Sequence, residues 1–437
     1  MSQSPLIDNA DPTETSADLT LPDVTMHSAL VPDDLHDALS RVLKPRRAMP
    51  ADAVRPTRAE INLAALRHNL HVMKKHAGTS KLWAVLKADA YGHGAPAVAR
   101  TLERAGADGF CVALLEEGVE LREAGITAPI LVMGGYYGSA FGEVIARRLT
   151  PVVYDLGQLE GFARLVRSGE VESKVVVHLK VDTGMARLGV TTSELPAFAD
   201  ALARFPEVQV GGLMTHLACA DAASEDELTY QMVRFDEATG LLAKHGVRPE
   251  VRHAANSAAL LRGHAQLDAV RPGVALFGVS PRIVRTEGRT EEDTMVTGLW
   301  PVMRVRTEII ALRDVPTGSP VGYGATFRTT RPTRIATIPM GYADGLSRHL
   351  SSKGHVLIAG RRAPIIGAIS MDMSMIDVTD FESAVAVRDE VVVLGPQEGR
   401  LGKDVITPDE VADQAGTIAW EVLTAVSRRV PRFYREP

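Results

Sequence analysis

Residues 81–94 read Lys-Leu-Trp-Ala-Val-Leu-Lys-Ala-Asp-Ala-Tyr-Gly-His-Gly. An apolar segment short enough to be a buried strand ends there abruptly at Lys87, and a glycine-rich turn follows. A lysine at a strand end, partly desolvated by its neighbours, can act as a nucleophile toward an aldehyde or as a general base. Tyr91 adds a hydroxyl, and Gly92 and Gly94 let the backbone approach an anion. A snorkelling lysine at a strand terminus is the plain alternative.

Composition narrows the classes of function. The 437 residues carry a formal net charge of -6 and only 5% aromatic residues, which provides neither a basic field nor stacking platforms for nucleic acid. The two cysteines, Cys111 and Cys219, lie in no CxxC or Cys/His cluster, so we predict no disulfide framework and no metal site. The sequence shows no signal peptide and no apolar run of about 18 residues. We expect a cytoplasmic enzyme with a small polar substrate and no membrane partner.

From Thr57 onward, apolar strand-like runs alternate with amphipathic helical runs, as in parallel βα units. Helices are predicted at residues 63–76, 95–105, 115–124 and 228–245. Strands are predicted at residues 82–86, 110–114, 129–133, 150–154, 174–181, 208–216, 250–255 and 268–277. About eight strands over this length favour a TIM barrel over an open sheet. No GxGxxG motif follows the first strand, which weakens a dinucleotide-binding alternative.

After about residue 300 the sequence becomes rich in Val, Ile and Thr between Gly, Pro and Asp turns. Strands are predicted there at residues 303–312, 321–327, 333–338, 355–357, 364–369, 374–378 and 390–394. We therefore predict an α/β TIM barrel at residues 56–297 followed by a C-terminal all-β domain at residues 298–437, joined by the charged stretch 280–297. Residues 1–55 form an acidic extension that buries too little apolar surface to fold, and we predict it to be disordered.

Polar side chains recur at the ends of the predicted barrel strands, which is where TIM barrels carry their catalytic groups. They are Lys87, Lys180, Asp182, Arg187, His216, Asn256, Ser257 and Arg271, and Gly273 and Val274 follow Arg271 at the eighth strand. A solvated strand end or an interior hydrogen-bonded histidine explains any one of them alone. Their convergence on one rim favours an active site.

The loops after the seventh and eighth strands suggest a phosphate site. Ser257 opens the helical run 257–261, so its hydroxyl and the first free amides of that helix would face an anion. Gly273, in the run Arg-Pro-Gly-Val at 271–274, could add backbone amides. A bare helix cap would need no ligand. A phosphate cradle beside an imine-forming lysine nevertheless points to pyridoxal 5′-phosphate.

Arg271 refines this chemistry. Arginine does not lose its proton in proteins, so a guanidinium that donates to the pyridine nitrogen leaves that nitrogen largely unprotonated. The ring is then a weaker electron sink, which suits a brief carbanion that is reprotonated and disfavours transamination. A surface ion pair is the alternative role for this arginine.

From about Thr57 to Arg432 the chain resembles the alanine racemases, pyridoxal-phosphate enzymes of the barrel type. The barrel motifs that carry the resemblance are Val-Leu-Lys-Ala-Asp-Ala-Tyr-Gly-His-Gly at 85–94, Lys-Val-Asp-Thr-Gly-Met-Ala-Arg-Leu-Gly at 180–189, Leu-Met-Thr-His-Leu-Ala at 213–218, Ala-Ala-Asn-Ser-Ala at 254–258 and Val-Arg-Pro-Gly-Val at 270–274. The resemblance implies that Lys87 is the cofactor lysine and that Arg187 binds the cofactor's phenolic oxygen and the substrate carboxylate. It makes Lys180 a lysine that some members carry as a carbamate. The remaining implied cofactor contacts are Tyr91, His216, Asn256, Ser257, Arg271, Gly273 and Val274.

Three further motifs fall in the predicted β domain: Val-Gly-Tyr-Gly-Ala-Thr-Phe at 321–327, Gly-Tyr-Ala-Asp-Gly at 341–345 and Ile-Ser-Met-Asp at 369–372. By resemblance, Tyr323 is the second base, Met371 binds the substrate carboxylate through its amide, and Tyr342 borders the substrate entryway. In the family these residues come from a partner subunit, which implies a head-to-tail homodimer with composite sites. Arg428 departs from some relatives, which carry a tyrosine near the phosphate and the entryway.

The implied activity is interconversion of L-alanine and D-alanine by two bases on opposite faces of a planar intermediate, with D-alanine going to peptidoglycan. Lys87 would serve the D face and Tyr323 the L face. The alternatives are a broad-specificity amino-acid racemase on the same scaffold, a related decarboxylase, and a non-catalytic pyridoxal-phosphate carrier. Arg271 argues against the decarboxylase, and the β domain argues against the carrier.

Overall fold

The computed structural model describes residues 54–135, 137, 140–282 and 298–436. Residues 1–53 of the predicted acidic extension (1–55) lie outside the described residues. Residues 283–297 of the predicted joining stretch (280–297) also lie outside them. The described residues form a nine-stranded, a ten-stranded and a two-stranded sheet. None of the described helices is long and apolar enough to cross a membrane.

The nine-stranded sheet is a barrel of parallel strands in the order β5-β4-β3-β2-β10-β9-β8-β6-β7, closed by pairing of β5 with β6. Its strands are β2 (Lys81–Val85), β3 (Gly109–Leu114), β4 (Ile130–Gly135), β5 (Thr150–Val153), β6 (Val175–Asp182), β7 (Val190–Thr191), β8 (Val208–Met214), β9 (Val251–His253) and β10 (Ala269–Val270). Parallel strands covered on both faces are apolar throughout, which is why the sequence predicted them. The predicted TIM barrel is confirmed.

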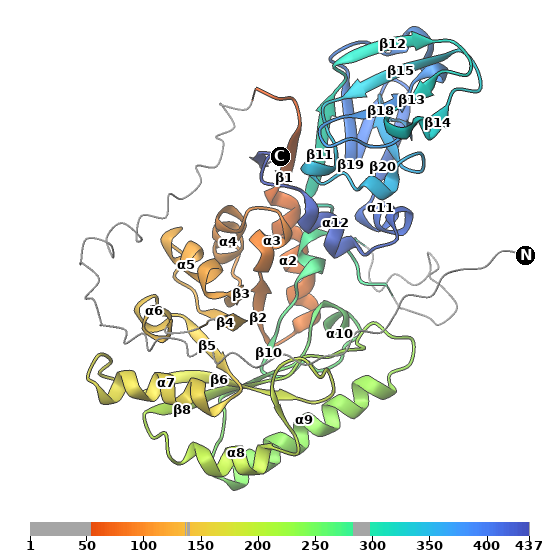
Figure 1. Ribbon diagram of the computed structural model, residues 1–437. Helices are drawn as coiled ribbons and strands as arrows, with labels where there is room; N and C mark the ends of the chain where they lie inside the picture. Colours follow the sequence, from red (N-terminus) through yellow and green to blue (C-terminus); the bar gives the residue numbers. More distant parts are fainter. Residues whose placement is uncertain (1–53, 136, 138–139, 283–297, 437) are drawn as a thin grey trace, which may run out of the picture. The chain divides into compact units, whose positions relative to one another are not determined.

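Helices alternate with the barrel strands (Figure 1). They are α2 (Leu63–Ala77), α3 (Lys87–Tyr91), α4 (Ala95–Arg104), α5 (Leu115–Glu123), α6 (Phe141–Ala146), α7 (Leu156–Arg167), α8 (Leu195–Leu202), α9 (Asp226–Lys244), α10 (Ser257–Leu261) and the 3-10 helix η2 (Val274–Phe277). In α4 the apolar side chains Val98 and Leu102, four residues apart, are fully buried. The predicted helices at 63–76, 95–105, 115–124 and 228–245 are confirmed to within two residues.

The C-terminal domain is built on the ten-stranded sheet, in the order β12-β15-β18-β17-β16-β19-β11-β1-β21 with β20 paired to β19. Its strands are β1 (Arg58–Asn62), β11 (Met303–Glu308), β12 (Ala311–Val315), β15 (Thr333–Ile338), β16 (His355–Ile358), β17 (Arg361–Ile366), β18 (Ser374–Asp377), β19 (Glu390–Gly399), β20 (Gly402–Ile406) and β21 (Arg432–Arg435). A separate hairpin pairs β13 (Pro320–Val321) with β14 (Phe327–Arg328). The second, β-rich domain is confirmed.

Two features of this domain differ from the expectation. Residues 58–62 fall in the range 56–297 that we predicted for the barrel domain, but they form strand β1, which pairs antiparallel with β11 and parallel with β21 and so belongs to the β sheet. The chain thus enters the barrel only at α2. Two helices, α11 (Pro408–Ala415) and α12 (Ala419–Ala425), follow β20 where we predicted no helix.

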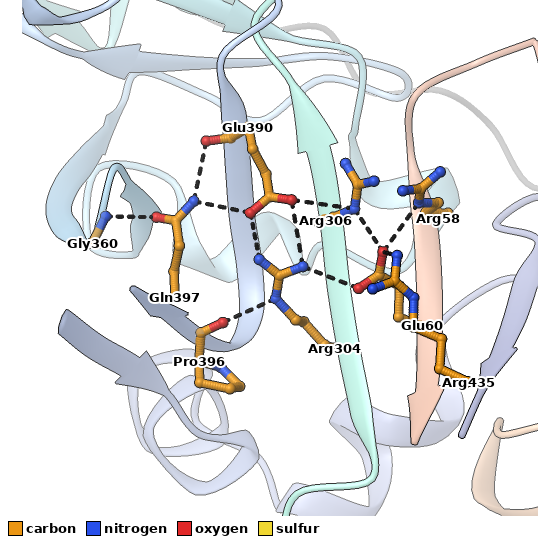
Figure 2. Close-up of polar contacts among 9 residues, drawn as sticks. All are labelled: Arg58, Glu60, Arg304, Arg306, Gly360, Glu390, Pro396, Gln397 and Arg435. Carbon is orange, nitrogen blue, oxygen red and sulfur yellow. Dashed lines mark hydrogen bonds and ion pairs between the residues drawn. The ribbon is translucent and has the colours of Figure 1, made fainter. Parts of the chain in front are cut away.

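A polar cluster fastens β1 to its neighbours (Figure 2). The buried carboxylate of Glu60 accepts hydrogen bonds from Arg306 Nε at 2.8 Å, Arg304 Nη1 at 3.0 Å, Arg435 Nη2 at 2.7 Å and Arg58 Nε at 3.2 Å. Arg304 and Arg306 also pair with Glu390 of β19. The cluster therefore joins strands from both ends of the described chain.

Replacing Glu60 with alanine is expected to lower the free energy of unfolding by about 3–5 kcal/mol, because it leaves partly buried arginines without their shared counter-ion. Urea unfolding followed by circular dichroism measures the loss. Glu398→Ala is the matched control, since Glu398 and its partner Lys403 are both largely exposed, and it should cost less than about 1 kcal/mol. Equal losses in the two variants would contradict the assignment.

Candidate active site

A cavity of about 420 Å³ lies at the carboxyl ends of the barrel strands. It is lined by most of the barrel residues predicted for the site: Lys87, Tyr91, His216, Asn256, Ser257, Arg271, Gly273 and Val274. These residues are far apart in the sequence but follow strands that end on the same rim. The structure thus brings them together as expected.

Lys87 begins α3, directly after the buried strand β2. Its side chain is exposed in the single chain and opens into the cavity, and desolvation by the protein around it lowers the pKa of its amine. The positive charge of Arg187 lowers the pKa further, whereas the carboxylate of Glu117 raises it. More of the amine is therefore unprotonated near neutral pH than for a free lysine.

Tyr91, Ser257 and Gly273 form one wall of the cavity. A Cβ atom at position 273 would lie only 2.4 Å from the Tyr91 hydroxyl, so any residue larger than glycine would displace the Tyr91 side chain. The Gly273 amide donates to Ser257 Oγ at 2.9 Å, which leaves the serine proton free to be donated elsewhere. Burial raises the pKa of the Tyr91 phenol, so Tyr91 remains a hydrogen-bond donor. This wall can hold an anion through hydroxyl groups.

Asn256, the residue before Ser257, also caps a helix. Its Oδ1 accepts a hydrogen bond from the Ala259 amide at 3.0 Å and caps α10. The side chain lines the cavity while it fixes the start of the helix that carries Ser257.

Arg271 is buried and bonds to neutral acceptors. It donates to His253 Nδ1 at 2.6 Å and to the carbonyl oxygens of Thr215 at 2.8 Å and Ala254 at 3.1 Å. Burial lowers the pKa of Arg271 to about 10, so it is still cationic at neutral pH. His253 in turn lies 2.8 Å from His178 Nδ1, and burial lowers the pKa of both histidines. The neutral imidazole of His253 and two backbone carbonyl oxygens therefore hold the guanidinium in place.

His216 and Lys180 lie among positive charges. Burial, followed by the charge of Arg271, lowers the pKa of His216 to about 3, so its ring is neutral. Burial, followed by the charge of Arg187, lowers the pKa of Lys180 to about 8. Arg187 itself is exposed, in the loop between β6 and β7. Asp182 holds this loop by accepting from the amides of Gly184 and Met185, at 2.9 and 2.8 Å.

The predicted residues of the β domain do not join this cavity within one chain. Tyr323, Tyr342 and Met371 are 73%, 43% and 52% exposed. Tyr323 opens the 3-10 helix η4 (Tyr323–Ala325) between two glycines with positive φ. Tyr342, in η5 (Tyr342–Asp344), lies beside Met371, because the Tyr342 amide bonds to Ser370 O at 3.0 Å and the Ala343 amide to Met371 O at 3.1 Å.

Arg428 also lies apart from the Lys87 cavity. It lines a second cavity of about 500 Å³ with Ala88, Glu116, Glu117 and Thr424.

Sequence reasoning missed several residues of the site. Ile418 and Trp420, at the start of α12, line the Lys87 cavity from the β domain of the same chain. His253, Glu117 and Asp221 were not singled out either. An acidic residue three positions into a helix after a strand, as in Leu-Leu-Glu-Glu at 114–117, was a signal for Glu117. No comparable signal marked Trp420.

Two family models together match most of the chain. The alanine racemase N-terminal domain matches residues 61–281, and the alanine racemase C-terminal domain matches residues 302–434. A protein of Sorangium cellulosum named alanine racemase is 58% identical over 391 residues, which covers 88% of this chain and 100% of the relative.

Solved structures agree with the sequence matches. The alanine racemase of a D-cycloserine-producing Streptomyces lavendulae has a TM-score of 0.79 at 35% identity and covers 88% of this chain and 98% of its own. The alanine racemase of Bartonella henselae, described with covalently bound pyridoxal phosphate, has a TM-score of 0.76 at 30% identity and covers 87% and 99%.

Proposed function

Because the chain belongs to the alanine racemase family, we propose that it interconverts L-alanine and D-alanine with pyridoxal 5′-phosphate and two bases. The observation that carries the proposal is the cavity in which a lysine of lowered pKa faces a hydroxyl-lined glycine wall and a buried arginine. D-alanine made in this way would serve peptidoglycan.

The residues present fit this cofactor. Lys87 would bind its aldehyde carbon, Tyr91 and Ser257 its phosphate, and Arg271 its pyridine nitrogen. A side chain at Gly273 would fill the space beside Tyr91, which supports a role of this position in admitting the phosphate. When bound, the cofactor withdraws electrons from the α-carbon of the substrate and so acidifies the α-proton. Arg271 stays protonated and can only donate, which favours reprotonation over transamination.

Proton transfer would use one base on each face of the substrate. Lys87, as a free amine, accepts the α-proton of D-alanine, and its ammonium returns a proton to the same face. Tyr323 would do the same for L-alanine. A phenol has an unperturbed pKa near ~10, so Tyr323 needs assistance. The ring of His216 stays neutral because burial and the charge of Arg271 lower its pKa to about 3, so it would assist Tyr323 by hydrogen bonding and not by accepting its proton.

Tyr323 implies a dimer. Its exposed position on the β domain suits a residue that completes the cavity of another chain. Met371 and Tyr342 are exposed together, and we assign them to substrate binding and to the entryway of the partner's site. The proposed assembly is therefore a homodimer with composite sites. Arg187, near Lys87, would bind the substrate carboxylate.

The test is incubation of the purified protein with L-alanine in deuterated buffer, followed by chiral chromatography and NMR of the α-position. We expect D-alanine to form with deuterium at Cα. L-serine and L-lysine in parallel incubations distinguish an alanine racemase from a broad-specificity racemase. Absence of both exchange and D-alanine would refute the proposal and leave the carrier as the alternative.

We also propose that Lys180 is carbamylated. An amine with a pKa of about 8 is partly unprotonated at neutral pH and can add CO₂, releasing one proton. The resulting anion would lie among Arg187, Arg271 and Lys87, the positive charges that lower this pKa. Protein equilibrated with ¹³C-bicarbonate should show a carbamate carbon resonance by NMR. The resonance should be absent from Lys180→Ala and present in Lys174→Ala, a change at an exposed lysine; a signal that survives in Lys180→Ala would contradict the assignment.

A further inference from the structure

The backbone that carries Lys87 into the cavity is strained. Ala88, Asp89, Ala90 and Tyr91 have φ values of 53°, 55°, 53° and 52°, a left-handed turn formed by residues other than glycine. Such a conformation is unfavourable for residues with a side chain, because the Cβ atom comes too close to the following carbonyl oxygen. The turn therefore persists only because surrounding groups hold it, and both Lys87 and Tyr91 depend on it.

Glu117 holds the first amide of this turn. Its Oε1 accepts a hydrogen bond from the Ala88 amide at 2.6 Å. Its Oε2 accepts from the amides of Ala113 at 2.8 Å and Leu114 at 3.1 Å. One carboxylate thus ties the residue after Lys87 to the end of the neighbouring strand β3. Hydrogen bonds to an ionised acceptor are stronger than neutral ones, so this connection is firm.

The charge of Glu117 also matters at this place. The other titratable groups around Lys87 in the barrel include Tyr91, Cys111, Lys180, Arg187, His216 and Arg271, which are cationic or neutral. Two further carboxyl groups lie nearby: Asp89 is in the same turn, and Asp221 lines the cavity. Burial raises the pKa of Tyr91 and of Cys111, so neither supplies a negative charge. The Glu117 carboxylate opposes the effect of Arg187 on the Lys87 amine.

We propose that Glu117 is a positioning residue for Lys87: it fixes the backbone amide that follows the lysine and supplies a negative charge beside the amine. The inference rests on the proposed role of Lys87 as a base. Neither the family assignment nor the cavity requires it, because Glu117 lines the second cavity and acts on the first through the turn.

Glu117→Gln tests both parts in the full-length holoenzyme. The amide side chain has one acceptor for three N–H donors and no charge. Hydrogen–deuterium exchange of peptides covering residues 87–92 should become about tenfold faster. The acid limb of kcat for D-alanine should move to lower pH, because the Lys87 ammonium loses its stabilising carboxylate. The control is Glu116→Gln, which removes the same charge from the preceding position. Glu116 accepts no hydrogen bond from a backbone amide among the described residues, so this change should leave the exchange rate unchanged.

Glu117→Asp separates geometry from charge. It keeps the negative charge but is too short to bridge the turn and β3, so exchange should be faster while the acid limb stays near that of the unaltered enzyme. The proposal would be overturned if residues 87–92 exchanged no faster in Glu117→Gln and Glu117→Asp than they do in Glu116→Gln. Failure of both to fold would show a purely structural role and overturn it as well. Exchange is read without substrate, so a chain that racemises nothing would refute the proposed function and not this inference.

Discussion

Replacing Lys87 with alanine is expected to lower the rate of racemisation from either enantiomer by about 10³-fold or more. The lysine has two tasks in the proposed mechanism, because it would bind the cofactor covalently and act as the base for D-alanine. Both depend on its position at the end of β2 and on the desolvation that lowers the pKa of its amine. Chiral chromatography of alanine measures the rate, and the visible absorption of protein-bound cofactor measures the covalent attachment.

The control for this variant is Lys81→Ala. Lys81 starts the same strand, but unlike Lys87 it lines neither of the cavities described above. Its loss should leave both rate and absorption near those of the unaltered protein. A Lys87→Ala enzyme that keeps more than about a hundredth of the rate would contradict a catalytic role, since a positioned base contributes at least that much.

The barrel could be predicted because its local and global signals agree. A strand buried on both faces is apolar throughout, and a helix between two such strands shows one apolar face. The eighth predicted strand was less accurate: residues 268–277 divide into β10 and the 3-10 helix η2. The run Arg-Pro-Gly at 271–273 ends the strand, because proline lacks the amide proton that a ladder requires.

Strand β1 could not be assigned to its sheet from the sequence, because its partners are far away in the chain. Glu60 faces Arg304 in β11 and Phe433 in β21. A charged residue in a five-residue segment also suggests an exposed position, whereas Glu60 is buried by the arginines that bind it. A pattern of hydrophobicity carries no information about such a pairing.

The site could be predicted where its residues follow strands, and not where they act through others. Lys87, His216 and Arg271 were singled out because many polar residues converge on the ends of the barrel strands, although each of them alone has a structural explanation. Glu117 and His253 instead hold another residue in place. The position of Glu117 in the first turn of α5 indicates a helix cap, but no pattern along the chain connects Glu117 with Lys87 or His253 with Arg271.

Replacing Tyr323 with phenylalanine is expected to lower the rate of α-proton exchange from L-alanine by about 10²–10⁴-fold, the contribution of one positioned acid–base group. Exchange from D-alanine in deuterated buffer should fall much less, since Lys87 would still remove that proton. The change deletes one oxygen from a side chain that is 73% exposed in the single chain, so stability should be unaffected. Equal losses from the two enantiomers would contradict the assignment of faces.

Mixing two inactive variants tests whether Tyr323 acts in another chain. If each site combines Lys87 of one subunit with Tyr323 of its partner, a heterodimer of Lys87→Ala and Tyr323→Phe chains has one site with both residues intact and one with neither. Random exchange of subunits would then restore about a quarter of the native sites. If both residues served the same chain, every site would lack one of them and mixing would restore nothing. The exposure of Tyr323, Met371 and Tyr342 in the single chain favours the first result, and racemisation after co-refolding of the two variants decides between them.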